Sequence, residues 1–410
     1  MALYDSATLY DSATVFDGVT AGTKPVFDVR LGDQIGGTGS TSVISKVRRI
    51  NITRGRGPLS FGTFDPGRCE IEFVDFDSSI LPGNTGGLQP RVNTPVQVSA
   101  TWGGETHFFF TGFLDTCSTR WVQGATVAFT SMSFTDGMKL LAKATTTVDG
   151  SDWDKPHVRV LAYLADINLG ASPGPSVLYE SATTYDTAGL YGGEYESRLI
   201  DTFNDANVAM DDTPRRSVLD AIRRVELAEA GALFFDANGR CVFLGRSRAW
   251  PVGEVQYALT DDSADTRNVT YTGITATTDE QLLYNRVTVT KTGGVEQLAE
   301  NTSSQTTYFV RDLNMTGVLI ANDPQAATLA AFHLAKRQLP LDRIDDLEVA
   351  VYASETNLQL ALGVELLDVV SVRRAAPSWT STTTLVVSGI RHTITPDDWR
   401  IQISTQQRTS

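Results

Sequence analysis

The residues that come nearest to a catalytic arrangement in this sequence are two carboxylates, Asp75 and Asp77. Two positions apart on a strand, they lie on one face, and paired carboxylic acids can act as acid and base in the cleavage of a sugar. Acidic pairs are also common where a strand gives way to a turn, and we favour this structural interpretation. No catalytic residue is therefore predicted, and we do not expect an enzyme.

Metal and cofactor chemistry has equally little support. The three cysteines and four histidines are scattered without the spacing of metal ligands. Gly36–Ser42 is rich in glycine but lacks the lysine of a phosphate-binding loop, and Asp261–Asp265 lacks the spaced glycine and distal glutamate of a calcium loop. We expect reduced, packed thiols, structural histidines at His333 and His392, and no bound metal or cofactor.

Basic side chains gather in two places, where contact with nucleic acid is one interpretation. The first is a run that consists of Lys46, Arg48, Arg49, Arg54 and Arg56. The second lies on a predicted helix and consists of Arg215, Arg216, Arg223 and Arg224. The first run has no interleaved aromatic residues for base stacking, so a solvated strand face or a subunit contact is favoured. The second group flanks an apolar stripe and is interpreted as the solvated edge of its helix.

The composition is that of a folded, acidic protein. Its 410 residues contain 34 Lys and Arg against 48 Asp and Glu, a net charge of −14, and 41% hydrophobic residues. This apolar content can offset the entropy of ordering the backbone, which excludes a disordered chain. No stretch approaches the ~20 apolar residues of a spanning helix, so no membrane insertion is expected. The acidity argues against a general attraction to nucleic acid, and no secretory signal is visible.

The distribution of predicted strands and helices along the sequence indicates a mainly β protein with an α+β insert. We expect an N-terminal arm at 1–20, a first β domain at 21–145, the insert at 146–250 and a second β domain at 251–410. Alternating residues predict strands at Val43–Arg54 and Arg68–Asp75. Further strands are expected at Pro95–Trp102, His107–Leu114, Ala125–Phe134, Asn285–Lys291, Thr306–Arg311, Leu347–Ala353, Leu366–Arg373, Thr383–Ile390 and Arg400–Ser404. Many short strands with regular turns favour barrels or sandwiches.

Four helices complete the predicted elements: Thr135–Ala142, Pro156–Leu169, Pro214–Ala230 and Pro324–Leu339. Pro214–Ala230 is the best marked, with Thr213 as the candidate N-cap and Gly231 as the C-cap. The segment Ala232–Leu244 after it predicts a hairpin that turns at Asn238-Gly239. The two β segments share a plan of strands plus one helix, which hints at duplication.

A short repeat carries aromatic residues that we interpret as contact candidates. Leu-Tyr-Asp-Ser-Ala-Thr occurs twice in succession from Leu3, and a related pair begins at Leu178. A hexad is too short for a folded repeat, but one acidic and one aromatic residue in each suit an extended arm that docks its rings on a neighbour. A terminus that orders only on a partner is the alternative for residues 1–17. The candidates are Tyr4, Tyr10, Phe16, Tyr179 and Tyr185.

The closing segment has a specific pattern: Gly389-Ile390-Arg391-His392-Thr393-Ile394-Thr395-Pro396-Asp397-Asp398-Trp399. It is similar to the "GI-x-H-x-I-T-P-x-x-W" hairpin of phage tail hub proteins, also called minor tail proteins, the baseplate hub family of siphophage tail tips. Other segments resemble the same family less specifically. Ile50–Arg56, Phe61–Phe73 and the Gly112-Phe113-Leu114-Asp115 strand resemble its opening part. The likeness spans nearly the whole chain.

The resemblance implies a trimeric hub at the distal end of a virion tail, made in the host cytoplasm. Two tube-like β domains in each subunit would then present six similar modules to a hexameric tail tube. The implied partners are a distal tail or tail tube protein, tail-tip or fibre proteins and the tape measure protein, while DNA passes through without specific binding. We further hypothesise that acidic residues face this passage, where they would repel phosphates.

Two alternatives come from other classes of protein. A carbohydrate-binding or carbohydrate-active β protein would use Trp102, Trp121 and Trp153 as a sugar platform, with Asp75 and Asp77 as its acids. The hub of a bacterial contractile injection system is hard to separate from a phage tail hub by sequence alone.

Overall fold

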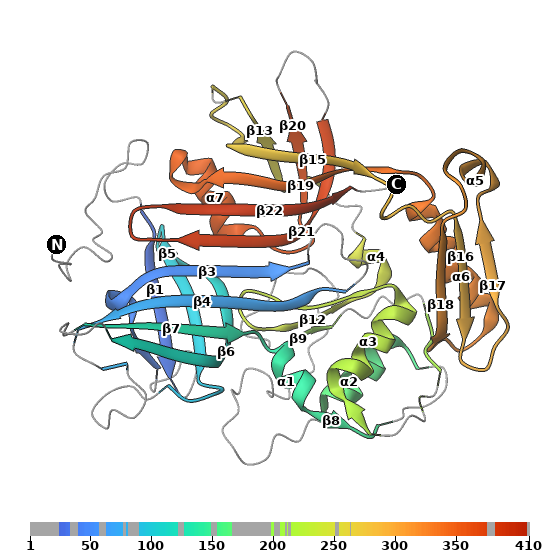
Figure 1. The fold of residues 1–410 in the computed structure, drawn as a ribbon, viewed down its shortest axis with the longest axis horizontal. Helices are drawn as coiled ribbons and strands as arrows, with labels where there is room; N and C mark the ends of the chain where they lie inside the picture. The colour runs from blue at the N-terminus through green and yellow to red at the C-terminus, as the bar shows by residue number, and fades with distance from the viewer. Residues whose placement is uncertain are drawn as a thin grey trace.

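The computed structural model in Figure 1 places two β segments one above the other, with an α+β insert and a further α/β unit beside them. It describes residues 24–32, 40–56, 63–76, 79–80, 90–121, 127–148, 154–165, 198–200, 206–209, 211, 215–250, 254–262, 264–374 and 382–407. The predicted mainly β fold with an α+β insert is confirmed. The domain boundaries at 20, 145 and 250 stay a prediction.

The first β segment forms one antiparallel run of strands around buried apolar residues. Its described strands are β1 (Val26–Gly32), β2 (Ser40–Ser42), β3 (Val47–Gly55), β4 (Asp65–Asp75), β5 (Pro95–Trp102), β6 (Glu105–Trp121) and β7 (Ala128–Thr135), in the spatial order β2-β1-β5-β6-β7-β4-β3. The period-two pattern predicted their inner face correctly, because Ile50, Ile52 and Ile71 are fully buried. Val43–Lys46 was expected to belong to β3, but Ile44–Lys46 forms a 3₁₀ turn before it.

The second β segment repeats the strand order of the first. Its described strands are β13 (Tyr257–Thr260), β14 (Val269–Thr270), β15 (Gly273–Asp279), β19 (Leu341–Ala350), β20 (Val369–Arg373), β21 (Thr382–Ile394) and β22 (Trp399–Gln407), in the order β14-β13-β20-β21-β22-β19-β15. When the strands of each segment are counted along the chain, both orders read 2-1-5-6-7-4-3. They differ at one edge, where β13 pairs in parallel with β14 and β20 but β1 pairs antiparallel with β2 and β5. The hint of duplication is thus a repetition of topology.

Strand β21 joins the two segments into one sheet. Its first half pairs with β20, from Thr382 to Val386, and its second half pairs with β3, where Gly389 lies opposite Gly55 and Ile394 opposite Ile50. Gly55 has a φ of +100°, and a Cβ there would collide with the carbonyl oxygen of Ser388. The next residue, Arg56, donates its backbone N–H to that same oxygen at 2.8 Å. Close backbone approach at this point therefore requires glycine.

An aromatic cluster packs the closing hairpin against the first β segment. Trp399, which begins β22, is fully buried and donates its indole N–H to Nδ1 of His392 at 3.3 Å. Its ring lies 5.1 Å from that of Phe27 in β1 and 5.4 Å from that of Phe109 in β6, both edge-on. The His and Trp of the hairpin motif therefore hold the two segments together, because edge-to-face aromatic pairs add to the free energy of burial.

The α+β insert contains four helices and two small sheets in its described part. They are α1 (Met138–Lys143), β8 (Thr145–Thr146), α2 (Pro156–Ala165), β9 (Arg198–Ile200), β10 (Arg216–Ser217), α3 (Val218–Glu229), β11 (Ala232–Phe235), β12 (Cys241–Leu244) and α4 (Arg246–Ala249). The hairpin β11–β12 turns at Asn238-Gly239, as predicted, with Gly239 at a φ of +83°. Together with α2 and α3, this confirms the α+β character of the insert.

The predicted ends of helix α3 were wrong. It begins at Val218 instead of Pro214, because the hydroxyl of Ser217 accepts from the backbone N–H of Asp220 and so forms the N-cap; Thr213 and Pro214 lie outside the described residues. At the other end Ala230 takes the left-handed conformation that was expected of Gly231. Gly231 instead passes close to the carbonyl oxygen of Leu244 on β12, where a Cβ would collide.

A second α/β unit projects between β15 and β19 and was missed by the sequence analysis. It consists of β16 (Arg286–Lys291), β17 (Gln297–Glu300), α5 (Thr302–Tyr308), β18 (Asp312–Val318) and α6 (Asp323–Arg337), with the sheet order β17-β16-β18. Val287 and Val289 of β16 are buried, as are Leu329 and Ala330 of the adjacent α6. We call residues 285–338 the outer unit. The backbones of Asp279 and Leu341, which flank it, lie opposite each other in the β15–β19 pair.

Two predicted strands of this region were wrong in part. Thr306–Arg311 is not a strand, because Asn301 caps helix α5 by accepting from the N–H of Ser304 and the strand begins only at Asp312. Leu347–Ala353 ends as a strand at Ala350, and Val351–Ala353 forms a 3₁₀ turn that leads into a second unpredicted helix, α7 (Glu355–Gly363). Both helices begin after a polar N-cap residue, Asn301 or Ser354. The sequence analysis missed them because it relied on apolar periodicity, which does not detect such caps.

We expect Gly55→Ala to destabilise the protein by at least about 2 kcal/mol, because the new methyl group meets the backbone of β21 and the residue holds a positive φ. Gly103→Ala is the matched control, since Gly103 also has a positive φ but faces open space; it should cost about 1 kcal/mol. Urea unfolding of both variants measures the difference, and equal losses would show that the close approach of β3 and β21 is unimportant.

Candidate interaction site at the junction of the β segments

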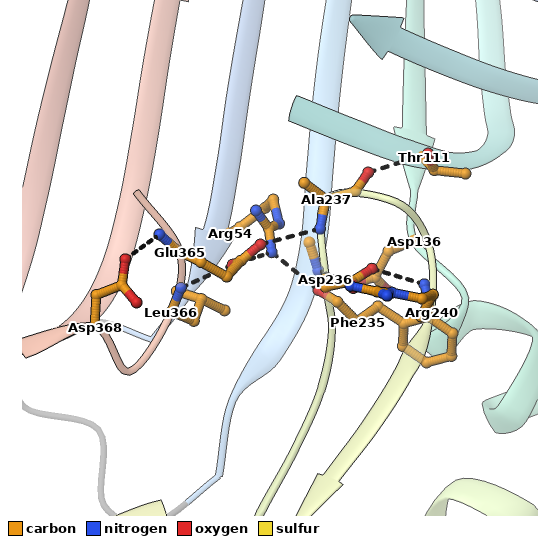
Figure 2. A network of polar contacts seen from close by, with 11 residues as sticks. Arg54, Thr111, Asp136, Phe235, Asp236, Ala237, Arg240, Glu365, Leu366 and Asp368 are labelled. Atoms are coloured by element: carbon orange, nitrogen blue, oxygen red, sulfur yellow. Dashed lines mark hydrogen bonds and ion pairs between the residues drawn. The ribbon is translucent and has the colours of Figure 1, made fainter. Parts of the chain in front are cut away.

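A buried ion pair stands where three parts of the chain meet. Arg54 of β3 places its guanidinium 2.5 Å from Oε1 of Glu365, which precedes β20, and the two side chains are only 5% and 14% exposed. The same guanidinium donates to the backbone carbonyl of Phe235 in β11 at 3.3 Å. Glu365 in turn accepts from the N–H of Ala237 at 3.3 Å. Figure 2 shows how this pair connects the first β segment, the second and the insert hairpin.

The tip of the β11–β12 hairpin is fixed by further hydrogen bonds in the same view (Figure 2). Thr111 of β6 donates its hydroxyl to the carbonyl of Ala237 at 3.1 Å. Inside the turn, Asp236 accepts from the backbone N–H of Arg240 at 2.8 Å and from its Nε at 2.5 Å. The tip of the hairpin therefore lies between the two β segments, and hydrogen bonds to both segments satisfy its polar groups.

Two carboxyl groups near this joint have strongly perturbed acidities. Burial raises the pKa of Asp136 to about 7, although it accepts from the backbone N–H groups of Gly67 at 2.6 Å and Met138 at 3.0 Å. Burial, with the charge of Glu365, also raises the pKa of Asp368 to about 7, and this group accepts from the N–H of Glu365 at 2.8 Å. Both carboxyl groups therefore hold a proton over much of the acidic range, because a buried site disfavours the charged form.

The carboxylate that was considered as a catalytic acid makes hydrogen bonds within the fold. Asp75 is fully buried and accepts from Nζ of Lys46 at 2.7 Å and from the N–H of Ile80 at 3.0 Å. Its partner Asp77 lies outside the described residues, as does Trp153 of the proposed sugar platform. Trp102 ends β5 opposite Glu105, the first residue of β6, whereas Trp121 is the last residue of β6, so the two rings form no common platform.

The basic run does not form one surface. Lys46 pairs with Asp75, Arg54 with Glu365, and Arg49 lies 4.0 Å from Glu72 on the solvated face of β4. Arg56 is buried, donates to Oε1 of Gln406 at 2.8 Å and stacks on the ring of Phe64. The expected solvated strand face holds for Arg49 and is wrong for Arg54 and Arg56, which turn inward to join the segments.

Three of the four arginines of the second group make contacts within the fold. Arg216, which lies in β10 and not on the helix, and Arg224 of α3 both pair with the buried carboxylate of Asp211, at 2.7 and 2.5 Å. Arg223 pairs with Glu226 of the same helix at 2.5 Å and donates to the carbonyl of Phe64. The expected solvated edge holds for Arg215, which is exposed, and is wrong for the other three, because a helical pattern does not reveal partners such as Asp211 and Phe64 outside the helix.

Histidine and cysteine have structural places. His333 and His392 are buried, and burial lowers the pKa of each to about 3, so both rings are neutral near pH 7. Cys69 and Cys241 are buried, and neither forms a disulfide within the described residues. Within the described ranges, no three His, Cys, Asp or Glu side chains come together to hold a metal ion. In the same residues, no helix is long and apolar enough to cross a membrane.

A polar sheet face runs across both β segments. Because directly paired residues share a face, Arg68 and Glu70 of β4 lie beside Thr53 and Asn51 of β3, which lie beside β21 and then β22. We call this the polar face; its charged members are Arg49, Arg68, Glu70, Glu72, Asp346, Glu348, Arg391 and Arg400. A groove of about 570 Å³ lies on it, lined in part by Arg68, Asp346 and Arg391.

The aromatic contact candidates cannot be placed. Tyr4, Tyr10, Phe16, Tyr179 and Tyr185 lie outside the described residues.

The junction around the Arg54–Glu365 pair was missed by the sequence analysis, since the two residues are 311 positions apart. The signal that could have found it is the position of each charge: Arg54 shares the strand face of the apolar Ile50 and Ile52, and Glu365 stands between apolar residues.

The fold is that of known tail proteins. No protein-family model matches the sequence, and no curated protein matches it. The tail protein from Neisseria meningitidis MC58 aligns with a TM-score of 0.62 at 13% identity, covering 93% of this chain and 96% of that one. The 43 kDa tail protein of prophage MuSo2 from Shewanella oneidensis aligns with a TM-score of 0.55 at 11% identity, covering 94% and 99%. The resemblance to phage tail proteins is therefore confirmed for the fold.

We expect Arg54→Met to cost about 3 kcal/mol or more in the free energy of unfolding, because it leaves the carboxylate of Glu365 buried without its cation. Combining it with Glu365→Gln should recover part of the loss. Arg286→Gln breaks the exposed pair with Asp312 and should cause no measurable change. Chemical unfolding of five proteins tests this: the wild-type, Arg54→Met, Glu365→Gln, the double variant and the Arg286→Gln control. A double variant as unstable as the sum of its single changes would contradict the coupling.

We expect Asp368→Asn to stabilise the protein increasingly as the pH rises. The native carboxyl keeps its proton up to about pH 7, whereas an unfolded aspartate loses it near pH 4, so ionisation costs the wild-type stability between these values. The stability difference between variant and wild-type should grow from pH 4 to 7 to on the order of 2 kcal/mol and then level off. Asp397→Asn, at an exposed position, is the control. A pH-independent difference would show that Asp368 titrates normally.

Proposed function

We propose that this protein is a structural, non-enzymatic component of a phage tail, and that three copies close into a hub at the distal tip. The observation that carries the proposal is the repeated 2-1-5-6-7-4-3 strand order. A chain with two copies of one unit can place six similar units in a ring of three subunits, which suits a sixfold tail tube. The shared fold with tail proteins supports the same assignment.

The polar face is our proposal for the wall of the passage. Both β segments contribute to this face without interruption, because β3 and β21 pair within it. Its charged members are four arginines and four carboxylates, so it offers phosphates no net attraction. Because this face carries no net charge from these residues, we propose that the net charge of −14 of the whole chain contributes to the repulsion of DNA. The acidic lining expected from the sequence stays a prediction.

A hub at the tip of a tail would also have partner proteins on both sides. We propose that one end of the ring contacts a tail tube or distal tail protein, and the other contacts tail-tip or fibre proteins and the tape measure protein. The hexad aromatics Tyr4, Tyr10, Phe16, Tyr179 and Tyr185 are proposed as contact residues. Trp102 lies beside the first residue of β6 and Trp121 is its last residue, and this separation gives the carbohydrate alternative no support.

Light scattering of the purified full chain tests the hub assignment. We expect particles of three chains of 44.4 kDa each, with no binding to duplex DNA at physiological salt. Deleting residues 1–17 should weaken assembly without lowering the stability of the subunit if the hexad arm contacts a neighbour. A chain that stays monomeric at every concentration, also when mixed with its tail tube protein, would overturn the proposal.

A further inference from the structure

A small cavity lies where the outer unit meets the rest of the protein. Its volume is about 60 Å³, and it is bounded by the residue after β3, by the C-terminal end of α3 and by the last two turns of α6. Such a volume holds roughly two to four water molecules or one small polyatomic ion. The cavity is separate from the junction in Figure 2, to which Arg54, Glu365 and the hairpin tip belong.

Positive charge converges on this cavity from two segments. Arg56 follows β3, and Arg337 is the last residue of α6; both are at most 8% exposed. His333 lies one helical turn before Arg337, so the two residues share the face of α6 that lines the cavity. The two guanidinium groups are close enough to interact, because burial and then the charge of Arg56 lower the pKa of Arg337 to about 9.

The carboxylate that lines the cavity is shared between two arginines: burial raises the pKa of Glu226, and the charges of Arg223 and Arg56 both act to lower it. Glu226 is 2.5 Å from the guanidinium of Arg223 and accepts from the N–H of Leu233 at 2.7 Å. The carbonyls that end α3 accept from their own cap, and that of Ala230 accepts from the indole of Trp250. At the end of α6, the carbonyls of Leu334 and Arg337 accept from the N–H groups of Gln338 and Tyr284.

We propose that this cavity binds one small oxyanion between the guanidinium groups of Arg56 and Arg337. Guanidinium groups present paired N–H donors that match the oxygen atoms of a phosphate or a carboxylate. The neutral His333 offers a further hydrogen-bonding nitrogen at the same wall. The bound ion would tie the outer unit to the end of β3, since it contacts one arginine from each. Free inorganic phosphate and a carboxylate presented by a partner protein share this chemistry.

Calorimetric titration of the full chain with inorganic phosphate, and separately with acetate, tests the site at constant ionic strength. We expect saturable binding of one anion per chain with a dissociation constant below about 10 mM. Arg337→Gln should weaken binding at least tenfold, and Arg337→Lys should weaken it less, because lysine keeps the charge without the fork. The control is Arg311→Gln in the outer unit, which breaks an exposed ion pair with Glu280 and should leave binding unchanged.

The two ligands distinguish the sources of the anion. Saturable binding of phosphate alone indicates a free inorganic ion, and binding of acetate indicates a carboxylate. Arg56→Gln provides a second variant on the opposite wall if Arg337→Gln fails to fold. Absence of saturable binding for both anions would overturn the proposal, as would binding that neither the Arg56 nor the Arg337 substitutions change.

Discussion

The antiparallel pairing of β3 with β21 is the contact on which the remaining architecture depends. It turns two seven-strand segments into one sheet, and it sets their relative register through Gly55 and Gly389. Because β20 and β3 share one edge of β21, neither segment presents that edge to solvent, where unpaired backbone groups invite aggregation. The buried Arg54–Glu365 pair and the aromatic cluster around Trp399 both lie at this joint. Their contacts can form only when β3 and β21 are paired.

The joint also explains why charged groups are buried between the two β segments. A buried ion pair gains little over apolar packing, but a wrong partner or a shifted register would leave a charge without its counterion. Arg54 meets Glu365 and the Phe235 carbonyl together only when β3, the β20 region and the insert hairpin are all in place. We interpret the pair as a device for specificity, which selects one arrangement of three segments over its near alternatives.

Local patterns in the sequence predicted the elements better than the contacts among them. Alternation placed Ile50, Ile52 and Ile71 on the inner face of their strands, and Asn238-Gly239 marked the hairpin, because these signals act between near neighbours. The same patterns missed α5 and α7, whose caps Asn301 and Ser354 are common in loops as well. They also placed Arg54 and Arg56 in solvent, since the partners Glu365 and Gln406 lie more than 300 positions away.

The place where the outer unit joins the sheet has a consequence for how such chains diversify. Asp279 and Leu341 face each other in the β15–β19 ladder, so the ends of the outer unit are separated by about one strand spacing, roughly 5 Å. A tight turn could bridge the same gap. Insertions, deletions or wholesale exchange between these two positions would alter the periphery of a particle while the strand registers inside it stay as they are. Chains that share this sheet can thus differ in what they carry at the β15–β19 edge.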